Sequence, residues 1–447
     1  MIILATALAW TIPLPAGADG ENPILAGPMV GHVSPGEARL WVRLAPGAVV
    51  EAEARQGGRR IEPTRIRDLG QGFHLLEFEG FRPGTGVEAR LTARLGEAVA
   101  RETATFRTYP VPARFGKVRI AFTSCNQDSR YERVPVMEAI AEERPDAAIH
   151  LGDNSYFVVG DGEWSTSGPR GDWSSAELMM ARHLRTRTNP DLQRLIRSVP
   201  NYAVWDDHDY GPNNSDREFP LKAESLAVFK MVWANPGYGT GESPGVFSAF
   251  RIGPAEVFLL DDRYYKYVAT EERPDVPEEE RTIWGEAQLR WLLAGLKAST
   301  APIKILANGT QMISRTERGE GHWQEARREL DRLLDFLREH RIGGVVILSG
   351  DRHYSESLAL RREGGPTIVE FTSSPVQQNQ DVGPLDVRHA AQLWGMRGNS
   401  YGLVTIEIGR DGEGTVRFEA RDVNNRVPIV GGQRCATTWA LRDLVYH

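Results

Sequence analysis

The chain is poor in cysteine and has no excess of positive charge. Its 447 residues include two cysteines, Cys125 and Cys435, which rules out a disulfide framework. A single disulfide between them is formally possible, but Cys125 ends a predicted strand in the most motif-rich part of the sequence. The 53 basic and 60 acidic residues give a formal net charge of −7. This balance favours solubility and offers no surface suited to nucleic acid or an anionic membrane.

Long apolar runs are also scarce. The exception is the N-terminal stretch MIILATALAWTIPLPAGA, which Pro13 and Pro15 interrupt and which is too short for a transmembrane helix. Its end, Ala16-Gly17-Ala18, resembles a signal-peptidase site, although a basic n-region is absent. We therefore expect residues 1–18 to be a signal peptide and the protein to be secreted or periplasmic. The alternative is an ordered N-terminal segment packed on the fold.

Signatures of two common hydrolase classes give no support to either class. The segment GESPG at 241–245 has the spacing G-x-S-x-G, but no helix is predicted to follow it, as a nucleophilic serine on a strand–turn–helix elbow would require. No H-E-x-x-H motif marks a zinc protease. The stretch GYGTGE resembles a phosphate-binding loop, but no Lys-Ser/Thr pair follows it, so it is interpreted as a turn.

The length favours two domains. Residues 22–110 contain short alternating segments, such as ARLWVRL at 38–44, separated by turn residues, a pattern typical of a β-sandwich. We expect a fibronectin-III-like domain there, joined by YPVPARFG to a second domain over residues 116–447.

Beyond the linker, strands alternate with helices. The order VRIAFTSC, RVPVMEAIAEE, PDAAIHLGD predicts two parallel strands joined by a right-handed helical crossover. Further along, WQEARRELDRLLDFLREH predicts one long helix, and the hairpin near the C-terminus is expected to turn at Asp411-Gly412. The second domain is thus predicted to be α/β.

Reactive side chains follow four of the predicted strands. In chain order they are Cys125 and Asn126; Asp153 and Tyr156; Asp206, Asp207, His208, Asp209 and Asn213; and Asp351 and His353. Any one set is most simply explained as a turn. Four sets are harder to explain in that way, because strand ends of one sheet share an edge and their side chains can converge.

The residue types in these sets are those of metal ligands. Carboxylate and amide oxygens suit Ca²⁺, Mg²⁺ or Mn²⁺, and imidazole suits iron or zinc. The phenol of Tyr156 and the thiol of Cys125, both deprotonated, favour ferric iron. Asp351 and His353 are two residues apart and point the same way on an extended segment. Asp153 is placed to bridge two metals.

The sequence also resembles a known family. The blocks SCN, GDNSY, WDDHDYGPNN and LSGDRH occur in the order seen in the PhoD-like alkaline phosphatases, within the calcineurin-like metallophosphoesterases, and LLDDRYY resembles another segment of that family. The resemblance covers about residues 118–410, and the β domain matches the family's N-terminal module. It implies a catalytic domain of two facing sheets flanked by helices, with metals between the strand ends.

The resemblance also implies a site. Ligands of Fe³⁺ and its neighbour would be Cys125, Asp153, Tyr156, Asp351 and His353, while Asp206 and Asn213 would bind Ca²⁺; Mn²⁺ and Zn²⁺ are alternatives. The spacing to Asn213 favours Asp206 as the ligand, whereas alignment with the superfamily's Asn-His block favours Asp207. The end of the chain, CATTWALRDLVYH, would be a short equivalent of a helix that caps the site.

The implied function is hydrolysis of phosphate esters by a hydroxide held between two metals. Asn126 and Arg352 would stabilise the phosphoryl charge, and His208 or a carboxylate such as Asp207 would protonate the leaving group. Alternatives are a phospholipase D-like or teichoic-acid-type phosphodiesterase, and a non-catalytic secreted binding protein. A mononuclear zinc hydrolase would leave Tyr156 and Asn213 without a role. We expect a monomer with a phosphate ester as its binding partner.

Overall fold

The computed structural model describes residues 22–160, 165–316, 320–378, 380–385 and 388–446. The expected signal peptide, residues 1–18, lies outside them. None of the helices in these ranges has the length and apolar character that a membrane span requires. Cys125 and Cys435 are both buried free thiols, so they form no disulfide.

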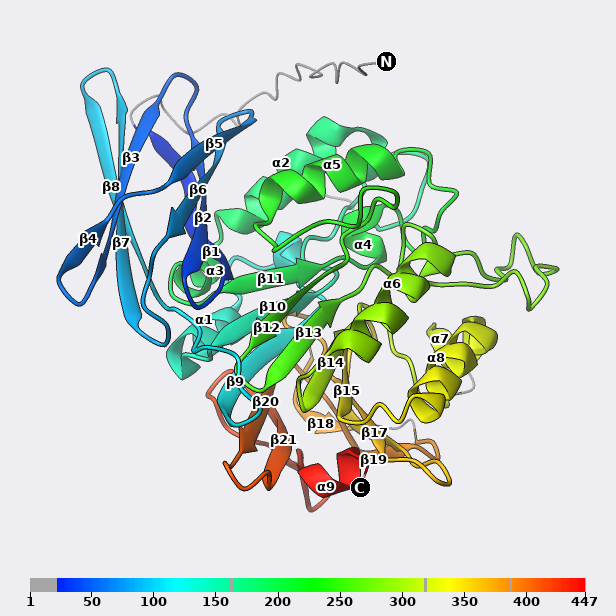
Figure 1. Ribbon diagram of the computed structural model, residues 1–447. Coiled ribbons are helices and arrows are strands. Elements are labelled where there is room, and N and C mark those ends of the chain that lie inside the picture. Colours follow the sequence, from blue (N-terminus) through cyan, green and yellow to red (C-terminus); the bar gives the residue numbers. More distant parts are fainter. Residues whose placement is uncertain (1–21, 161–164, 317–319, 379, 386–387, 447) are drawn as a thin grey trace.

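The first part of the described chain is all-β, as predicted. It forms two antiparallel sheets with strand orders β1-β2-β6-β5 and β4-β3-β7-β8, seen in blue and cyan in Figure 1. The strands are β1 (Ile24–Val33), β2 (Glu37–Leu44), β3 (Val49–Gln56), β4 (Arg59–Ile61), β5 (Arg65–Gly70), β6 (Phe73–Glu79), β7 (Gly86–Leu95) and β8 (Ala98–Arg107).

The β domain is joined to the rest of the protein by specific hydrogen bonds. Trp41 Nε1 donates to Met231 O at 2.7 Å, and the backbone N–H of His32 donates to Ala234 O at 2.8 Å. Trp41 is completely buried although it lies on the opposite face of β2 from Leu40. Both faces of this strand are therefore covered, one by the sandwich core and the other by the second domain.

Residues after 116 form the α/β part. A six-stranded sheet has the order β11-β10-β9-β20-β21-β24, an eight-stranded sheet the order β12-β13-β14-β15-β17-β16-β19-β18, and β22 and β23 form a small ribbon. The strands are β9 (Gly116–Thr123), β10 (Ala147–Leu151), β11 (Asn201–Val204), β12 (Ser248–Ile252), β13 (Ala255–Leu259), β14 (Ile303–Ala307), β15 (Val345–Ser349), β16 (Ser355–Leu360), β17 (Ile368–Thr372), β18 (Gly383–Pro384), β19 (Gln392–Arg397), β20 (Tyr401–Ile408), β21 (Gly414–Arg421), β22 (Ile429–Val430), β23 (Gln433–Arg434) and β24 (Ala436–Ala440).

Helices cover both sheets. The α-helices are α1 (Pro135–Glu143), α2 (Ala176–Arg187), α3 (Pro190–Ile196), α4 (Asp207–Tyr210), α5 (Lys222–Val232), α6 (Gly285–Ala298), α7 (His322–Glu325), α8 (Arg327–Glu339) and α9 (Leu441–Leu444), with short 3₁₀ turns η1 (Asp128–Arg130) and η2 (Asp172–Ser174). Figure 1 shows α6 and α8 on one side of the molecule and α2 and α5 on another.

The burial pattern of β15 shows how the layers are built. Val346 and Leu348 point into the core shared with the six-stranded sheet, whereas Val345 and Ile347 pack into a second core with α6 and α8. Side chains of a strand alternate between faces, so a strand buried on both faces is apolar throughout. The predicted arrangement of two facing sheets flanked by helices is confirmed.

Two local predictions have different outcomes. The predicted single helix of WQEARRELDRLLDFLREH is wrong, because the backbone of Ala326 (φ −137°, ψ 54°) separates α7 from α8. The predicted turn between β20 and β21 is confirmed, and Gly412 there has φ +86°, a conformation that glycine adopts without steric cost.

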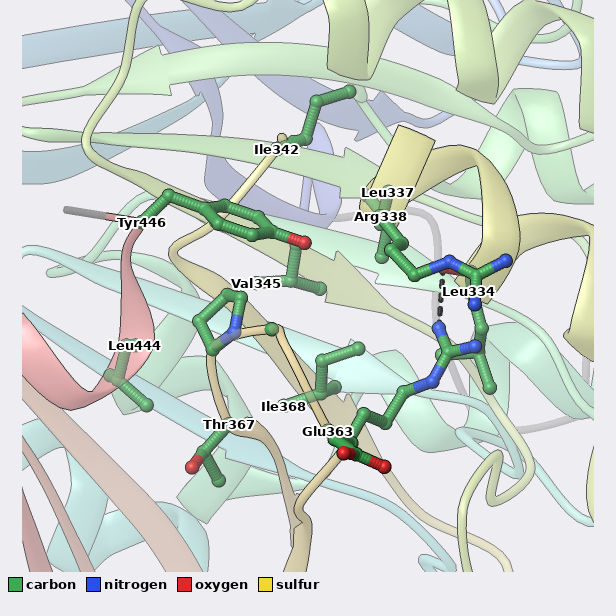
Figure 2. A pocket seen from close by; sticks show the side chains of 14 residues that line it. Leu334, Leu337, Arg338, Ile342, Val345, Glu363, Thr367, Ile368, Leu444 and Tyr446 are labelled. Carbon is green, nitrogen blue, oxygen red and sulfur yellow. Dashed lines mark hydrogen bonds between the residues drawn. The ribbon is translucent and has the colours of Figure 1, made fainter. Parts of the chain in front are cut away.

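The C-terminal segment lies at the wrong end of the sheet to cap the predicted site. Leu444 O accepts a hydrogen bond from Gly344 N, just before β15 begins, whereas Asp351 follows the other end of that strand. Figure 2 shows Leu444 and Tyr446 beside Val345 in a small pocket of about 20 Å³. The short helix α9 therefore closes the opposite end of the sheet.

Candidate metal centre

The predicted reactive groups meet where parallel strands end. Cys125 follows β9, Asp153 follows β10 and Asp207 follows β11, three neighbouring strands of the six-stranded sheet. The two sheets come close here. A side chain at Gly350 would place its Cβ 2.4 Å from the Cβ of Ser124 in the other sheet. Within the six-stranded sheet, a side chain at Gly152 would place its Cβ 2.5 Å from the Cβ of Asp206.

A first group of donors surrounds Asp153. Its Oδ2 lies 3.1 Å from Tyr156 Oη and 3.4 Å from Cys125 Sγ, and Tyr156 Oη lies 3.2 Å from His353 Nε2. One potential ligand atom from each of Cys125, Asp153 and His353 falls within a mutual distance of 4.8 Å. Thiol, phenol, imidazole and carboxylate thus converge, as the sequence predicted.

A second group shares the same aspartate. Potential ligand atoms of Asp153, Asp207 and His208 also lie within 4.8 Å of one another. Asp153 Oδ1 accepts the backbone N–H of His208 at 3.2 Å, and the His208 ring stacks on Tyr156 with centroids 4.3 Å apart. Asp153 is therefore positioned to bridge two cations.

Four of these residues have backbones in the left-handed region. The φ angles are +60° at Cys125, +52° at Asp153, +69° at Asp351 and +55° at His353. For residues with a Cβ this region costs roughly 1–3 kcal/mol each and persists only where the surroundings impose it. The fold therefore holds these four side chains in place although their backbone conformations are strained.

The structure distinguishes Asp206 from Asp207. The Nε of Arg263 donates to Asp206 Oδ1, its Nη2 forms an ion pair with the same oxygen, and Nη2 also donates to Glu320 Oε2 at 3.1 Å. Asp206 is thus bound to a cation of the protein itself. Asp207 instead accepts the backbone N–H of Asn214 at 2.7 Å and faces His208, with Oδ1 3.9 Å from Nε2.

The remaining predicted residues lie around these groups. Asn126 is buried, and its Nδ2 donates to Asn154 O at 3.4 Å. Arg352 is half-buried, with Nη1 3.7 Å from Asp351 Oδ2. Asn213 is exposed; its backbone N–H donates to Thr166 O, and it lines a polar hollow.

Burial and crowding of acidic groups shift the pKa values. Burial and the nearby Asp207 raise the pKa of Asp153 well above its usual range. Burial and the charge of Asp153 likewise raise the pKa values of Cys125 and Tyr156. Burial raises the pKa of Asp351 to about 7. Without a cation, the protein environment thus disfavours the ionised forms of these four side chains.

The donor set fits two metal ions. Thiol, phenol and imidazole donors form one set, Asp207 and His208 form the other, and both sets include Asp153. A cation near acidic groups whose pKa is raised would stabilise their ionised forms, which are the forms that bind metals. Burial lowers the pKa of His353 to about 4, so its ring is neutral and able to act as a ligand at neutral pH.

Sequence reasoning gave no role to two residues that build this site. Asp209 accepts the backbone N–H groups of Asp153, Asn154 and Asp206 at 3.2, 3.1 and 2.8 Å. Arg263 holds Asp206. Asp209 lies in the block WDDHDYGPNN and Arg263 in LLDDRYY, two of the segments that resemble the family. The sequence therefore pointed to these segments, but it did not indicate which residues the two side chains contact.

Comparison with known proteins identifies the family. A sequence model of the PhoD-like phosphatases matches residues 120–427. The chain belongs to the PhoD-like phosphatase family. Alkaline phosphatase D of Bacillus subtilis (strain 168) is 28% identical over 402 residues, which cover 77% of this chain and 66% of that protein. The match thus falls just short of two thirds of that relative's length.

Solved structures support the PhoD-like fold. A structure of PhoD superposes with a TM-score of 0.72 at 20% identity, over 94% of this chain and 90% of that one. The purple acid phosphatase PPD1 of yellow lupin (Lupinus luteus) seeds gives 0.61 at 10% identity, over 92% and 73%. These similarities extend across both the β domain and the α/β part.

Proposed function

We propose that this protein hydrolyses phosphate esters with the help of two metal ions, ferric iron and Ca²⁺. The observation that carries the proposal is the pair of donor groups that share Asp153, in a member of the PhoD-like phosphatase family. A purely structural turn would not require a buried thiol, phenol and imidazole around one carboxylate.

The donor chemistry assigns the ions to the two groups. Cys125, Tyr156 and His353 would hold iron, because thiolate and phenolate suit a strongly Lewis-acidic ion. Asp207 would hold Ca²⁺ through oxygen, with Asp153 between the two ions. When bound, the ions would supply an activated water and positive charge for the phosphoryl oxygens.

The protein's own groups would handle the substrate. Arg352 is the half-buried cation beside Asp351 and would bind a phosphoryl oxygen. The amide of Asn126 would donate to a second oxygen. His208 lies between Asp207 and Tyr156 and would move a proton at the leaving group. Burial lowers the pKa of His208, and Asp207 opposes that shift.

A polar hollow supports phosphodiesters as a second substrate class. It has a volume of about 560 Å³, and its lining includes Asn213, Lys266 and Glu320. Asn214 also lines the hollow, and its backbone N–H donates to Asp207 Oδ2, so the hollow adjoins the candidate metal centre. A space of this size is within the range of small-molecule sites and would accept a second ester substituent.

One experiment tests the proposal. The purified protein is analysed for metals by mass spectrometry and assayed with p-nitrophenyl phosphate and bis(p-nitrophenyl) phosphate, before and after chelation. We expect iron and calcium, with hydrolysis that chelation abolishes and the metals restore. The diester should be the better substrate if the hollow receives a substituent. Stoichiometric metal without turnover of either ester would favour a binding protein on the same fold.

A further inference from the structure

Arg187 is a buried cation without an anionic partner. It ends α2 and has no exposed surface. Its Nη2 donates to Val232 O at 2.8 Å, and its guanidinium carbon lies 3.8 Å from the ring centroid of Trp233. Arg187 forms no ion pair with any described residue. Buried arginines are rare unless they are paired, because desolvating the charge is costly.

A cavity lies beside this arginine. Its lining includes Thr123, Asn126, Asp153, Arg187 and Trp233. The Nε of Arg187 and the Nε1 of Trp233 are both buried without a hydrogen-bond partner. The two groups are neighbours, because the guanidinium stacks on the indole. The space suffices for about one particle of water or chloride size.

We propose that this cavity binds a small monovalent anion of chloride size. Arg187 Nε and Trp233 Nε1 can donate hydrogen bonds but cannot accept them, so the occupant accepts from both. The hydroxyl of Thr123, also buried without a partner, supplies a third donor. Only an anion also balances the charge of Arg187.

Other lining groups limit where the anion sits. The carboxylate of Asp153 is directed to the metal centre, where it accepts from the backbone N–H of His208 and the hydroxyl of Tyr156. Asn126 contributes an acceptor, Oδ1, which would repel an anion. The anion therefore lies at the end of the cavity formed by Arg187 and Trp233.

The electrostatics agree with this geometry. Burial lowers the pKa of Arg187 to about 9, although the charges of Asp209 and Asp128 oppose that shift. The two carboxylates thus compensate the cation only in part. An anion in contact with the guanidinium would complete the compensation and stabilise the folded state.

Bromide and thermal stability test the site together. Crystals in sodium bromide are measured at the bromine edge, and melting temperatures are compared in sodium chloride and sodium gluconate at equal ionic strength. We expect an anomalous peak next to Arg187 Nε and Trp233 Nε1, and a melting temperature roughly 1–3 °C higher in chloride. Gluconate is too large for the cavity.

Variants link the response to the cavity. Trp233→Phe keeps an aromatic ring, although a smaller one, and removes the indole N–H, whereas Arg187→Met removes the charge; both should lose the chloride effect. Trp284→Phe is the control, since Trp284 is equally buried and its Nε1 donates to Asn308 Oδ1 at 3.0 Å. It should be destabilised yet still respond to chloride. If Arg187→Met does not fold, the melting temperatures of Trp233→Phe in the two salts test the site alone. No bromide peak and equal melting in both salts would overturn the proposal and leave water as the occupant.

Discussion

Arg263 binds Asp206 through two of its nitrogens, and each side chain is only 1% exposed. The next residue, Asp207, is directed toward Asp153 and His208 instead. Two adjacent aspartates therefore serve different partners. One compensates a buried cation, and the other belongs to the candidate metal centre.

The first prediction separates these roles. Asp207→Asn should bind calcium at least 10-fold more weakly while melting close to the wild type. Asp206→Asn should keep most of its metal but lose roughly 3–5 kcal/mol of stability, because Arg263 is left buried without its main partner. Metal per chain and unfolding by denaturant check both. The assignment is wrong if folded Asp206→Asn lacks metal and Asp207→Asn retains it.

The second prediction concerns the ligands of iron. A phenolate or thiolate on ferric iron gives a visible charge-transfer band. Tyr156→Phe keeps the buried ring but removes its oxygen, so the band should fade or shift and iron should bind less well. Cys125→Ser should perturb the same band. Trp173→Phe, a substitution of another buried aromatic, is a control that should leave the spectrum unchanged. An unaltered band in both ligand variants would contradict the assignment.

The third prediction assigns Asp209 a positioning role. Its carboxylate joins the loops after β10 and β11, so Asp209→Asn should weaken metal binding by about 10–100-fold. Asp261→Asn is the matched control. Asp261 is an equally buried carboxylate that accepts backbone N–H groups of Val246 and Tyr264. Comparable loss of metal affinity in the two variants, measured by titration of metal-free protein, would show a general effect of destabilisation instead.

The fourth prediction concerns pH. Burial raises the pKa of Glu370 to about 7, and its carboxylate accepts the backbone N–H groups of Met312 and Ile313. The folded state thus holds this proton more tightly than the unfolded state. The contribution of Glu370 to the free energy of unfolding is fully present below pH 4.5. It is lost as the pH rises to 7, by at most about 1.4 kcal/mol per pH unit. Relative to Glu370→Gln, the wild type should therefore be more stable at pH 5 than at pH 8. A difference between the two proteins that does not vary with pH would refute the shift.

The fifth prediction tests the contact between the domains. Removing residues 1–113 would expose the surface that Trp41 and its neighbours cover. The fragment should be less soluble than the full chain, although every candidate ligand is still present. Trp41→Ala in the full chain should weaken the contact between the β domain and the α/β part, with a smaller loss of solubility than in the fragment. Metal analysis of soluble fragment checks that the β domain supplies no ligand, and a folded fragment without metal would show that it does.

The sequence was sufficient for the fold class and for the convergence of most side chains in the candidate metal centre. Both followed from short blocks in which glycine, carboxylate and imidazole stand at strand ends, since parallel strands bring such ends together. Cys125, Asp153, Tyr156 and His353 meet for that reason.

The remaining features depend on contacts between distant residues. The side chain of Asp206 is held by Arg263, 57 positions away, and no local pattern indicates that pairing. The break between α7 and α8 at Ala326 interrupts a sequence with strong helical periodicity. The C-terminal segment has no motif that tells which end of the sheet it covers.

The left-handed backbones at the site have a consequence for protein engineering. Replacement of Asp153 or Asp351 by glycine would relieve backbone strain and remove a carboxylate whose pKa burial raises. Screens of metal-free protein for heat resistance would therefore enrich such substitutions, and the selected variants would lack candidate metal ligands. Selection for thermal tolerance should therefore be carried out with the proposed ions, iron and calcium, present, so that the candidate ligands stabilise the protein instead of destabilising it.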